Sequence, residues 1–122
     1  MLYDSGDAKQ VLEYIKEKYQ TEPEFLWDKS NNAIFRHKDN RKWYAAILNI
    51  PKNKLGIEGE ENIDILDLKC DPALKDSIID NIKYFAGYHM NKEHWITIIL
   101  DGTVPIKDIF YFIDLSYELT KK

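Results

Sequence analysis

The chain has 122 residues, of which 44% are hydrophobic and 13% aromatic, and its formal net charge is −4. That length suits one domain and leaves no room for two, and the composition is too apolar for a disordered chain. The acidic balance disfavours a protein that binds nucleic acid through its overall charge. The chain has one cysteine, no signal-like start and no apolar stretch near the ~20 residues that span a membrane. We therefore expect a cytoplasmic protein.

The first half of the chain predicts one helix followed by strands. Apolar residues recur at helical spacing from Asp7 to Tyr19. The apolar period then changes to two, which predicts strands at Phe25–Trp27, Ala33–His37 and Trp43–Ile50. The polar run between the last two strands has the composition of a hairpin turn.

The third quarter predicts a strand and a second helix. Ile63–Leu68 alternates again and reads as the fourth strand. Asp71 and Pro72 have the composition of a helix start, with an N-cap acid and a proline in the first turn. We expect this helix to run to about Asn81, with three residues facing inward: Leu74, Ile78 and Ile82.

The last quarter predicts an aromatic loop, a strand and a final helix. The loop covers Tyr84–Asn91, the strand His94–Leu100, and the helix Pro105–Leu119. The predicted order is therefore α-β-β-β-β-α-β-α. Hairpins followed by helices favour an α+β fold in which helices pack against a bent antiparallel sheet, as a single domain over residues 1–122.

The main electrostatic feature is a basic strip from Lys29 to Lys54. It carries a charge of +6, with Asp39 as its one acid, and contains both arginines of the chain. Its centre is the predicted hairpin, which resembles the wing of a nucleic-acid-binding protein. We expect phosphate contacts from seven side chains, namely Arg36, Lys38, Arg41, Lys42, Lys29, Lys52 and Lys54. The alternative is an exposed hairpin whose lysines keep a sheet edge soluble.

The segment from Tyr84 to Trp95 is unusually aromatic for a loop. Its rings either cap the sheet or form a recognition surface. In the second case, six residues would make contacts: Tyr88, His89, Asn91, Lys92, His94 and Trp95. A pocket for a small molecule or a protein would then be lined by Trp43, Tyr84, Tyr88 and Trp95.

Catalytic and metal-binding patterns are weak. Cys70 with His89 or His94 could form a nucleophile and base, but Cys70 ends a predicted strand where a small buried residue is usual. The two histidines are five residues apart and no second cysteine is present, so we expect no metal site. No phosphate-binding glycine loop or dinucleotide fingerprint occurs, and we expect no cofactor.

Ordered motifs along nearly the whole chain carry a family resemblance. They lie at residues 35–37, 42–45, 68–72 (LKCDP), 87–92 (GYHMNK), 94–97 (HWIT), 101–102 and 115–119 (LSYEL). In these motifs the chain resembles the MmcQ/YjbR family. The resemblance implies a CyaY-like fold, DNA binding through a "double wing" of hairpins, and no catalytic residue. We therefore expect a non-enzymatic DNA-binding protein or, alternatively, a small-molecule or protein-binding module that uses the His89–Trp95 loop.

Overall fold

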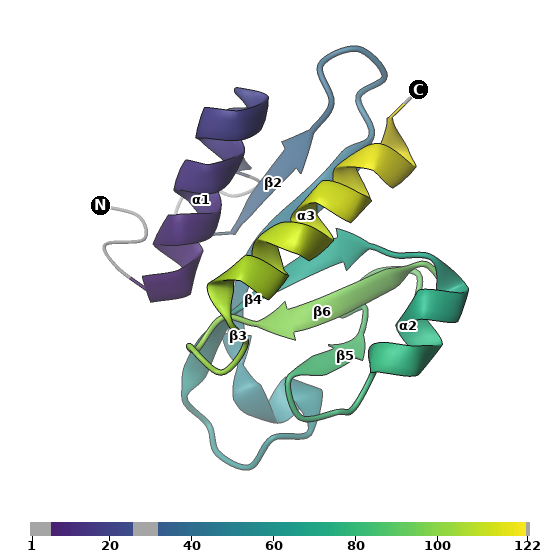
Figure 1. Ribbon diagram of the computed structural model, residues 1–122. Coiled ribbons are helices and arrows are strands. Elements are labelled where there is room, and N and C mark those ends of the chain that lie inside the picture. Colours follow the sequence, from purple (N-terminus) through teal and green to yellow (C-terminus); the bar gives the residue numbers. More distant parts are fainter. Residues whose placement is uncertain (1–5, 26–31, 122) are drawn as a thin grey trace.

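A six-stranded antiparallel sheet forms the centre of the molecule, and helices α1 and α3 lie side by side against it (Figure 1). The computed structural model describes residues 6–25 and 32–121. The strands follow the order β1-β2-β3-β4-β6-β5, and every neighbouring pair is antiparallel. The elements are α1 (Gly6–Tyr19), β1 (Glu24–Phe25), β2 (Ala33–Arg36), β3 (Trp43–Pro51), the 3-10 helix η1 (Lys52–Leu55), β4 (Asn62–Lys69), α2 (Pro72–Ile78), β5 (Tyr84–Ala86), β6 (Trp95–Ile99) and α3 (Ile106–Thr120).

The predicted α+β class is confirmed, with one strand added to the predicted order. Tyr84–Ala86, which we expected to begin a loop, form β5 and pair with β6 at the sheet edge. A three-residue strand is too short to show an alternating pattern, so only its partner reveals it. Leu26 and Trp27, the rest of the first predicted strand, lie outside the described residues.

Helix α2 is shorter than predicted. Its N-cap is confirmed, because the Asp71 carboxylate accepts the backbone N–H groups of Ala73 and Leu74. The helix ends at Ile78, and the Asp80 carboxylate then accepts three backbone N–H groups of the following turn. Ile82, expected to face inward, lies in that turn and is 68% exposed. The local turn therefore replaces the last helical turn.

The sheet is buried on both faces. The larger core lies between the sheet and helices α1 and α3, and it includes Val11, Ile15, Phe35, Leu66, Ile98 and Ile113. A smaller core lies on the opposite face, and η1 and Tyr88 pack against it. It consists of the strand residues Leu48, Ile50, Ile65, Phe85 and Ile99. Strands covered on both sides have continuous apolar runs, which explains the sequence of β3.

A bulge in β3 connects the sheet to α3. Phe35 pairs with Ala45 and Arg36 with Trp43, so Tyr44 is the extra residue. The Ser116 hydroxyl of α3 donates to the Tyr44 carbonyl at 2.6 Å and accepts the Lys69 backbone N–H at 2.9 Å. One buried hydroxyl thus satisfies backbone groups of both β3 and β4.

Candidate functional site

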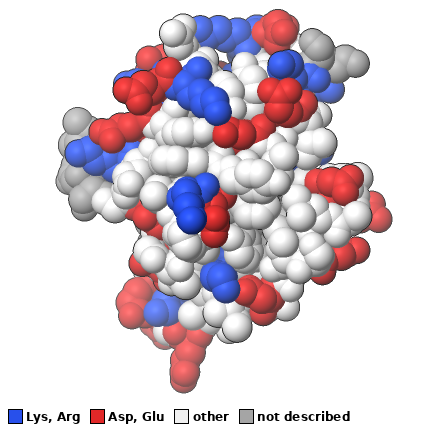
Figure 2. All heavy atoms as spheres, viewed as in Figure 1, with Lys and Arg blue, Asp and Glu red and all other residues white. Residues whose placement is uncertain are grey.

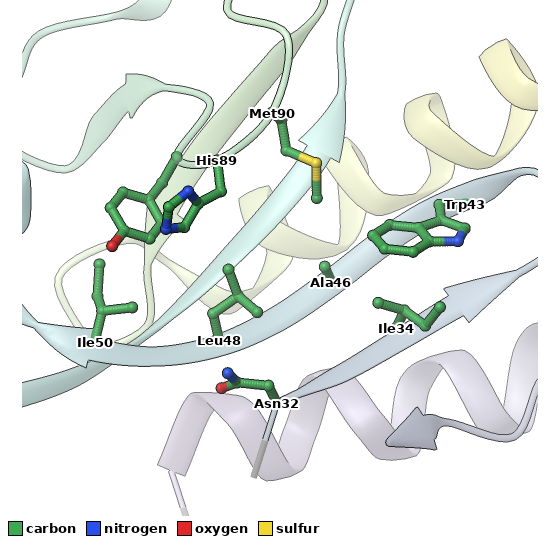
Figure 3. A pocket seen from close by; sticks show the side chains of 9 residues that line it. Asn32, Ile34, Trp43, Ala46, Leu48, Ile50, His89 and Met90 are labelled. Carbon is green, nitrogen blue, oxygen red and sulfur yellow. The ribbon is translucent and has the colours of Figure 1, made fainter. Parts of the chain in front are cut away.

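A cavity of about 520 Å³ opens on the sheet face that carries the smaller core. Its floor is apolar and comes from β2 and β3, while the segment after β5 forms the opposite wall (Figure 3). The lining residues, together called the sheet pocket here, are Asn32, Ile34, Trp43, Ala46, Leu48, Ile50, Tyr88, His89 and Met90. An apolar concave surface with a few polar groups at its edge is typical of a small-molecule site.

The β3 bulge decides which side chains reach the pocket. Ala46, Leu48 and Ile50 alternate on one face, as a strand requires. Trp43 would face the other side in a regular strand, but the extra residue Tyr44 brings it to the pocket face. Figure 3 shows Trp43 beside Ala46 and Ile34 at one end of the floor.

The pocket wall is held close to β6. Gly87 donates its N–H to the Trp95 carbonyl at 2.9 Å, and Tyr88 donates its N–H to the Thr97 hydroxyl at 2.8 Å. A Cβ atom on Gly87 would lie 2.6 Å from the Trp95 Cβ, so only glycine permits this approach. The backbone then turns at His89 with φ of +60°, a left-handed conformation that costs energy for a histidine.

Polar groups of the pocket lie mainly on that wall. The His89 ring is exposed and lies 4.2 Å from the Tyr88 ring, edge to face. Within the described residues, neither the imidazole nor the Tyr88 hydroxyl has a hydrogen-bond partner. The Asn32 side-chain oxygen Oδ1 accepts the Asn49 backbone N–H at 2.8 Å. A ligand can therefore form hydrogen bonds at the wall while its apolar part covers the floor.

The predicted recognition residues divide between the pocket and the loop frame. Tyr88 and His89 line the pocket. The Asn91 side-chain oxygen Oδ1 accepts the Glu93 backbone N–H, and the Lys92 ammonium group donates to the Gly87 backbone carbonyl at 2.7 Å. The remaining two residues have structural contacts: the His94 carbonyl accepts the Cys70 N–H, and the Trp95 ring lies under the Lys69 ammonium group.

Of the four aromatic residues expected to line a pocket, Trp43 and Tyr88 do so. Tyr84 instead packs edge to face against Phe112 of α3, on the other face of the sheet. Sequence reasoning missed the floor (Ile34, Ala46, Leu48 and Ile50) and Met90. The continuous apolar run of β3 was an available signal, because it indicates that both faces of the strand are covered.

The predicted wing is a real hairpin, but its arginines have partners. Arg36 donates to both carboxylate oxygens of Glu24, at 2.9 and 2.8 Å, and an Arg41 nitrogen lies 4.0 Å from the same carboxylate. The Arg36 hydrogen bond is the chief reason that the pKa of the Glu24 carboxyl group is lowered. Lys38 and Lys42 are exposed and have no ion pair in the part of the chain that the structure describes.

The basic strip does not form one surface. Lys52 and Lys54 lie in η1, at the opposite end of β3 from the hairpin turn, roughly 30 Å away along the strand (Figure 1). Lys52 is also 3.6 Å from the Glu61 carboxylate. Figure 2 shows acidic and basic side chains interspersed on the face that it displays. Lys29 lies outside the described residues.

Cys70 is buried, as its place at a strand end indicated, and burial raises the pKa of its thiol. A nucleophilic cysteine needs the opposite shift. Across residues 6–25 and 32–121, no three His, Cys, Asp or Glu side chains gather as a metal site requires. In the same ranges, no helix is long and apolar enough to cross a membrane.

Comparison with known proteins gives a consistent family match. The sequence pattern of the YjbR family matches residues 16–119. The chain is 45% identical to the uncharacterized protein YyaQ of Bacillus subtilis, over 91% of this chain and 95% of that protein. It is 36% identical to the uncharacterized protein YjbR of Escherichia coli K12, over 48% of this chain and 50% of that protein.

Two solved structures share the fold. A crystal structure of a Pseudomonas syringae protein is 43% identical and superposes with a TM-score of 0.88, covering 93% of this chain and 97% of that one. A Deinococcus radiodurans protein is 23% identical with a TM-score of 0.72, covering 100% and 83%. The second likeness supports the fold alone.

Proposed function

This chain belongs to the YjbR family, and we propose that it is a binding protein whose sheet pocket takes a small, largely apolar, ring-containing molecule. The observation that carries the proposal is an apolar floor on β2 and β3 facing an aromatic wall across a cavity of about 520 Å³. A volume of this size suits a molecule of one or two fused rings with short substituents.

The side chains suggest how such a ligand is recognised. The Trp43 indole and the Met90 thioether offer surfaces on which a flat ring packs favourably. The Tyr88 hydroxyl and the His89 imidazole can form hydrogen bonds with a polar substituent. Among the described residues, no Lys, Arg, Asp or Glu side chain lines the cavity, which favours a neutral ligand.

The test is a titration of the ¹⁵N-labelled protein with indole and with 2-naphthol, followed through backbone amide shifts. We expect shifts centred on the pocket floor and wall, at Ala46, Leu48 and Met90. In the variant Ala46→Leu, the larger side chain fills the floor, and these shifts should disappear. Ala73→Leu, an equal enlargement at an exposed position of α2, should leave them unchanged.

Two results would overturn the proposal. One is the absence of pocket shifts at millimolar concentrations of either probe. The other is a set of shifts that persists in Ala46→Leu, since the probe would then bind elsewhere. Thermal unfolding of both variants checks that each remains folded.

A second candidate function is DNA binding through the β2–β3 hairpin, as the family resemblance implies. The observation that favours it is the exposed pair Lys38 and Lys42 at a projecting turn (Figure 1). Lysines at such a position can contact phosphates without breaking an existing ion pair. The pairing of both arginines with Glu24 reduces what the hairpin can contribute.

Fluorescence anisotropy of a labelled mixed-sequence duplex at two salt concentrations tests this second candidate. We expect binding that weakens steeply with salt, and a clear loss of affinity in Lys38→Ala/Lys42→Ala. The matched control is Lys9→Ala/Lys107→Ala, which removes the same charge elsewhere on the molecule. Equal effects of the two double variants would reject the hairpin as the contact surface.

A further inference from the structure

A buried carboxyl group lies directly beside the pocket. Asp67 of β4 is fully buried, and its cross-strand partners are Ala46 of β3 and Thr97 of β6. Ala46 belongs to the pocket floor. One carboxyl oxygen, Oδ1, accepts the Thr97 hydroxyl, while Oδ2 has no hydrogen-bond partner among the described residues. Most buried polar atoms have a partner, so this exception requires an explanation.

Thr97 connects that carboxyl group to the pocket wall. Its hydroxyl donates to Asp67 and accepts the backbone N–H of Tyr88 at 2.8 Å. The Tyr88–Met90 wall is thus one side chain away from Asp67. Lys92 lies on the same segment and donates to the Gly87 carbonyl, at the start of the wall.

The surroundings favour the neutral acid. Burial raises the pKa of Asp67 to about 7, against the opposing effects of the Thr97 hydrogen bond, the Lys92 charge and the Tyr88 N–H. A neutral carboxyl group avoids leaving a charged oxygen buried without a partner. Among the described residues, Lys92 on the wall segment is the charged group that acts on the Asp67 carboxyl, and Lys69 lies two positions further on, on the same face of β4. The adjoining positions of β3 and β6 are Ala46 and Thr97, which do not titrate in this range.

We propose that Asp67 is a positioning residue for the sheet pocket, and that the Thr97 hydroxyl transmits the protonation state of its carboxyl group to the Tyr88–Met90 wall. The inference rests on the proposed function for its role in binding, but the coupling itself is a property of the free protein. Ionisation leaves a charged oxygen unpaired and attracts Lys92 away from the Gly87 carbonyl. An apolar ligand that excludes water from the pocket makes ionisation less favourable still, so ligand affinity falls as pH rises through neutrality.

The coupling can be measured without a ligand. Histidine side chains also change charge near neutral pH, so the experiment uses a His89→Gln background. The Asp67 side-chain ¹³C shift and the Tyr88 and Met90 amide shifts are followed from pH 5.5 to 8.5. We expect the Asp67 shift and the two amide shifts to change with pH at one common midpoint. In Asp67→Asn the pH-dependent change of both amide shifts should disappear. The control Asp76→Asn, which replaces an exposed acid of α2, should keep it. If the Tyr88 and Met90 amide shifts change with pH in Asp67→Asn as they do in the parent, the inference is overturned.

Thr97 provides an independent check that does not remove the acid. Thr97→Val keeps the shape but removes the hydroxyl, so the amide transitions should disappear while Asp67 still titrates. Thr97→Ser keeps the hydroxyl and should restore them. Transitions that persist in Thr97→Val would show that the wall responds to pH by another route.

The ligand experiment separates this inference from the proposed function. Affinity for indole in the His89→Gln background should fall about three- to tenfold between pH 6 and pH 8, and should be constant in Asp67→Asn. If indole and 2-naphthol fail to bind at any pH while the amide transitions follow Asp67, the proposed function is rejected and the coupling stands. If they bind with the same pH dependence in Asp67→Asn, the coupling is rejected and the pocket stands.

Discussion

Arg36 and Glu24 form a two-bond ion pair across the β1–β2 edge of the sheet. The Arg36 Nε atom donates to Oε2 of Glu24 at 2.9 Å, and Nη2 donates to Oε1 at 2.8 Å. Planar pairs of this geometry are the stronger kind of ion pair. Arg36, which the charge of the sequence predicts as a phosphate contact, is therefore already paired with the Glu24 carboxylate.

This pair makes a prediction about DNA. Glu24→Gln removes the charge that holds Arg36 and Arg41, so duplex affinity at low salt should rise several-fold if the hairpin contacts DNA. Anisotropy titrations at several salt concentrations should also show a steeper salt dependence. Glu22→Gln, which changes the net charge equally beside Lys16, is the control. An equal effect of both variants would indicate a general charge effect only.

The left-handed backbone at His89 predicts opposite effects on stability and binding. His89→Gly should raise the free energy of unfolding by up to about 1 kcal/mol, because glycine adopts φ of +60° without strain. The same change removes an imidazole from the pocket and should weaken probe binding. Urea unfolding and the indole titration measure the two effects.

Asn81 supplies the matched control for His89, because it also has a left-handed backbone, with φ of +59°, in an exposed turn and does not line the pocket. Asn81→Gly should leave probe binding unchanged. A loss of binding in both variants would mean that general loosening, and not the His89 side chain, is responsible.

The two hydrogen bonds of the Ser116 hydroxyl lead us to expect that its removal lowers the free energy of unfolding. Ser116→Ala leaves the buried Tyr44 carbonyl and the partly buried Lys69 N–H without this partner and should lower the free energy of unfolding in urea by about 1–3 kcal/mol. Ser77→Ala removes an exposed hydroxyl that bonds the Leu74 carbonyl, and should stay within about 0.5 kcal/mol. Equal costs for the two variants would contradict the role of Ser116 at the bulge.

Asp67 predicts how stability varies with pH. Its folded-state pKa of about 7 lies above the ordinary value of 3.8, so the folded protein binds this proton more tightly than the unfolded chain. The stability linked to this group is fully present below about pH 4 and is lost as pH rises to about 7. Asp67→Asn should therefore be more stable than the parent at pH 8, by about 2–4 kcal/mol, and the difference should shrink toward pH 5.

Urea unfolding of Asp67→Asn and the parent at pH 5, 6, 7 and 8 measures that difference. Asp76→Asn should follow the parent throughout. If the difference in free energy of unfolding between Asp67→Asn and the parent stays constant from pH 5 to pH 8, Asp67 is already ionised in the folded protein over this range.

Much of the fold could be predicted because its signals are local. The apolar periods of α1, β4 and α3 and the apolar run of β3 lie within each segment, and the Asp71 cap lies within three residues of the N–H groups that donate to it. Strand β5 could not be predicted, because three residues carry no period and are a strand only by pairing with β6. The predicted recognition loop included Tyr88 and His89 of the pocket wall but none of the floor.

The sequence by itself determined an α+β domain, a basic hairpin and an aromatic segment between Tyr84 and Trp95, because composition and periodicity act over neighbouring residues. Only the tertiary structure decided what these features do. It placed Glu24 against Arg36, turned Trp43 to the pocket face through a bulge, and brought Asp67 under a wall that begins about twenty residues later. Such relationships depend on strand register, and register is set by the packing of the whole sheet.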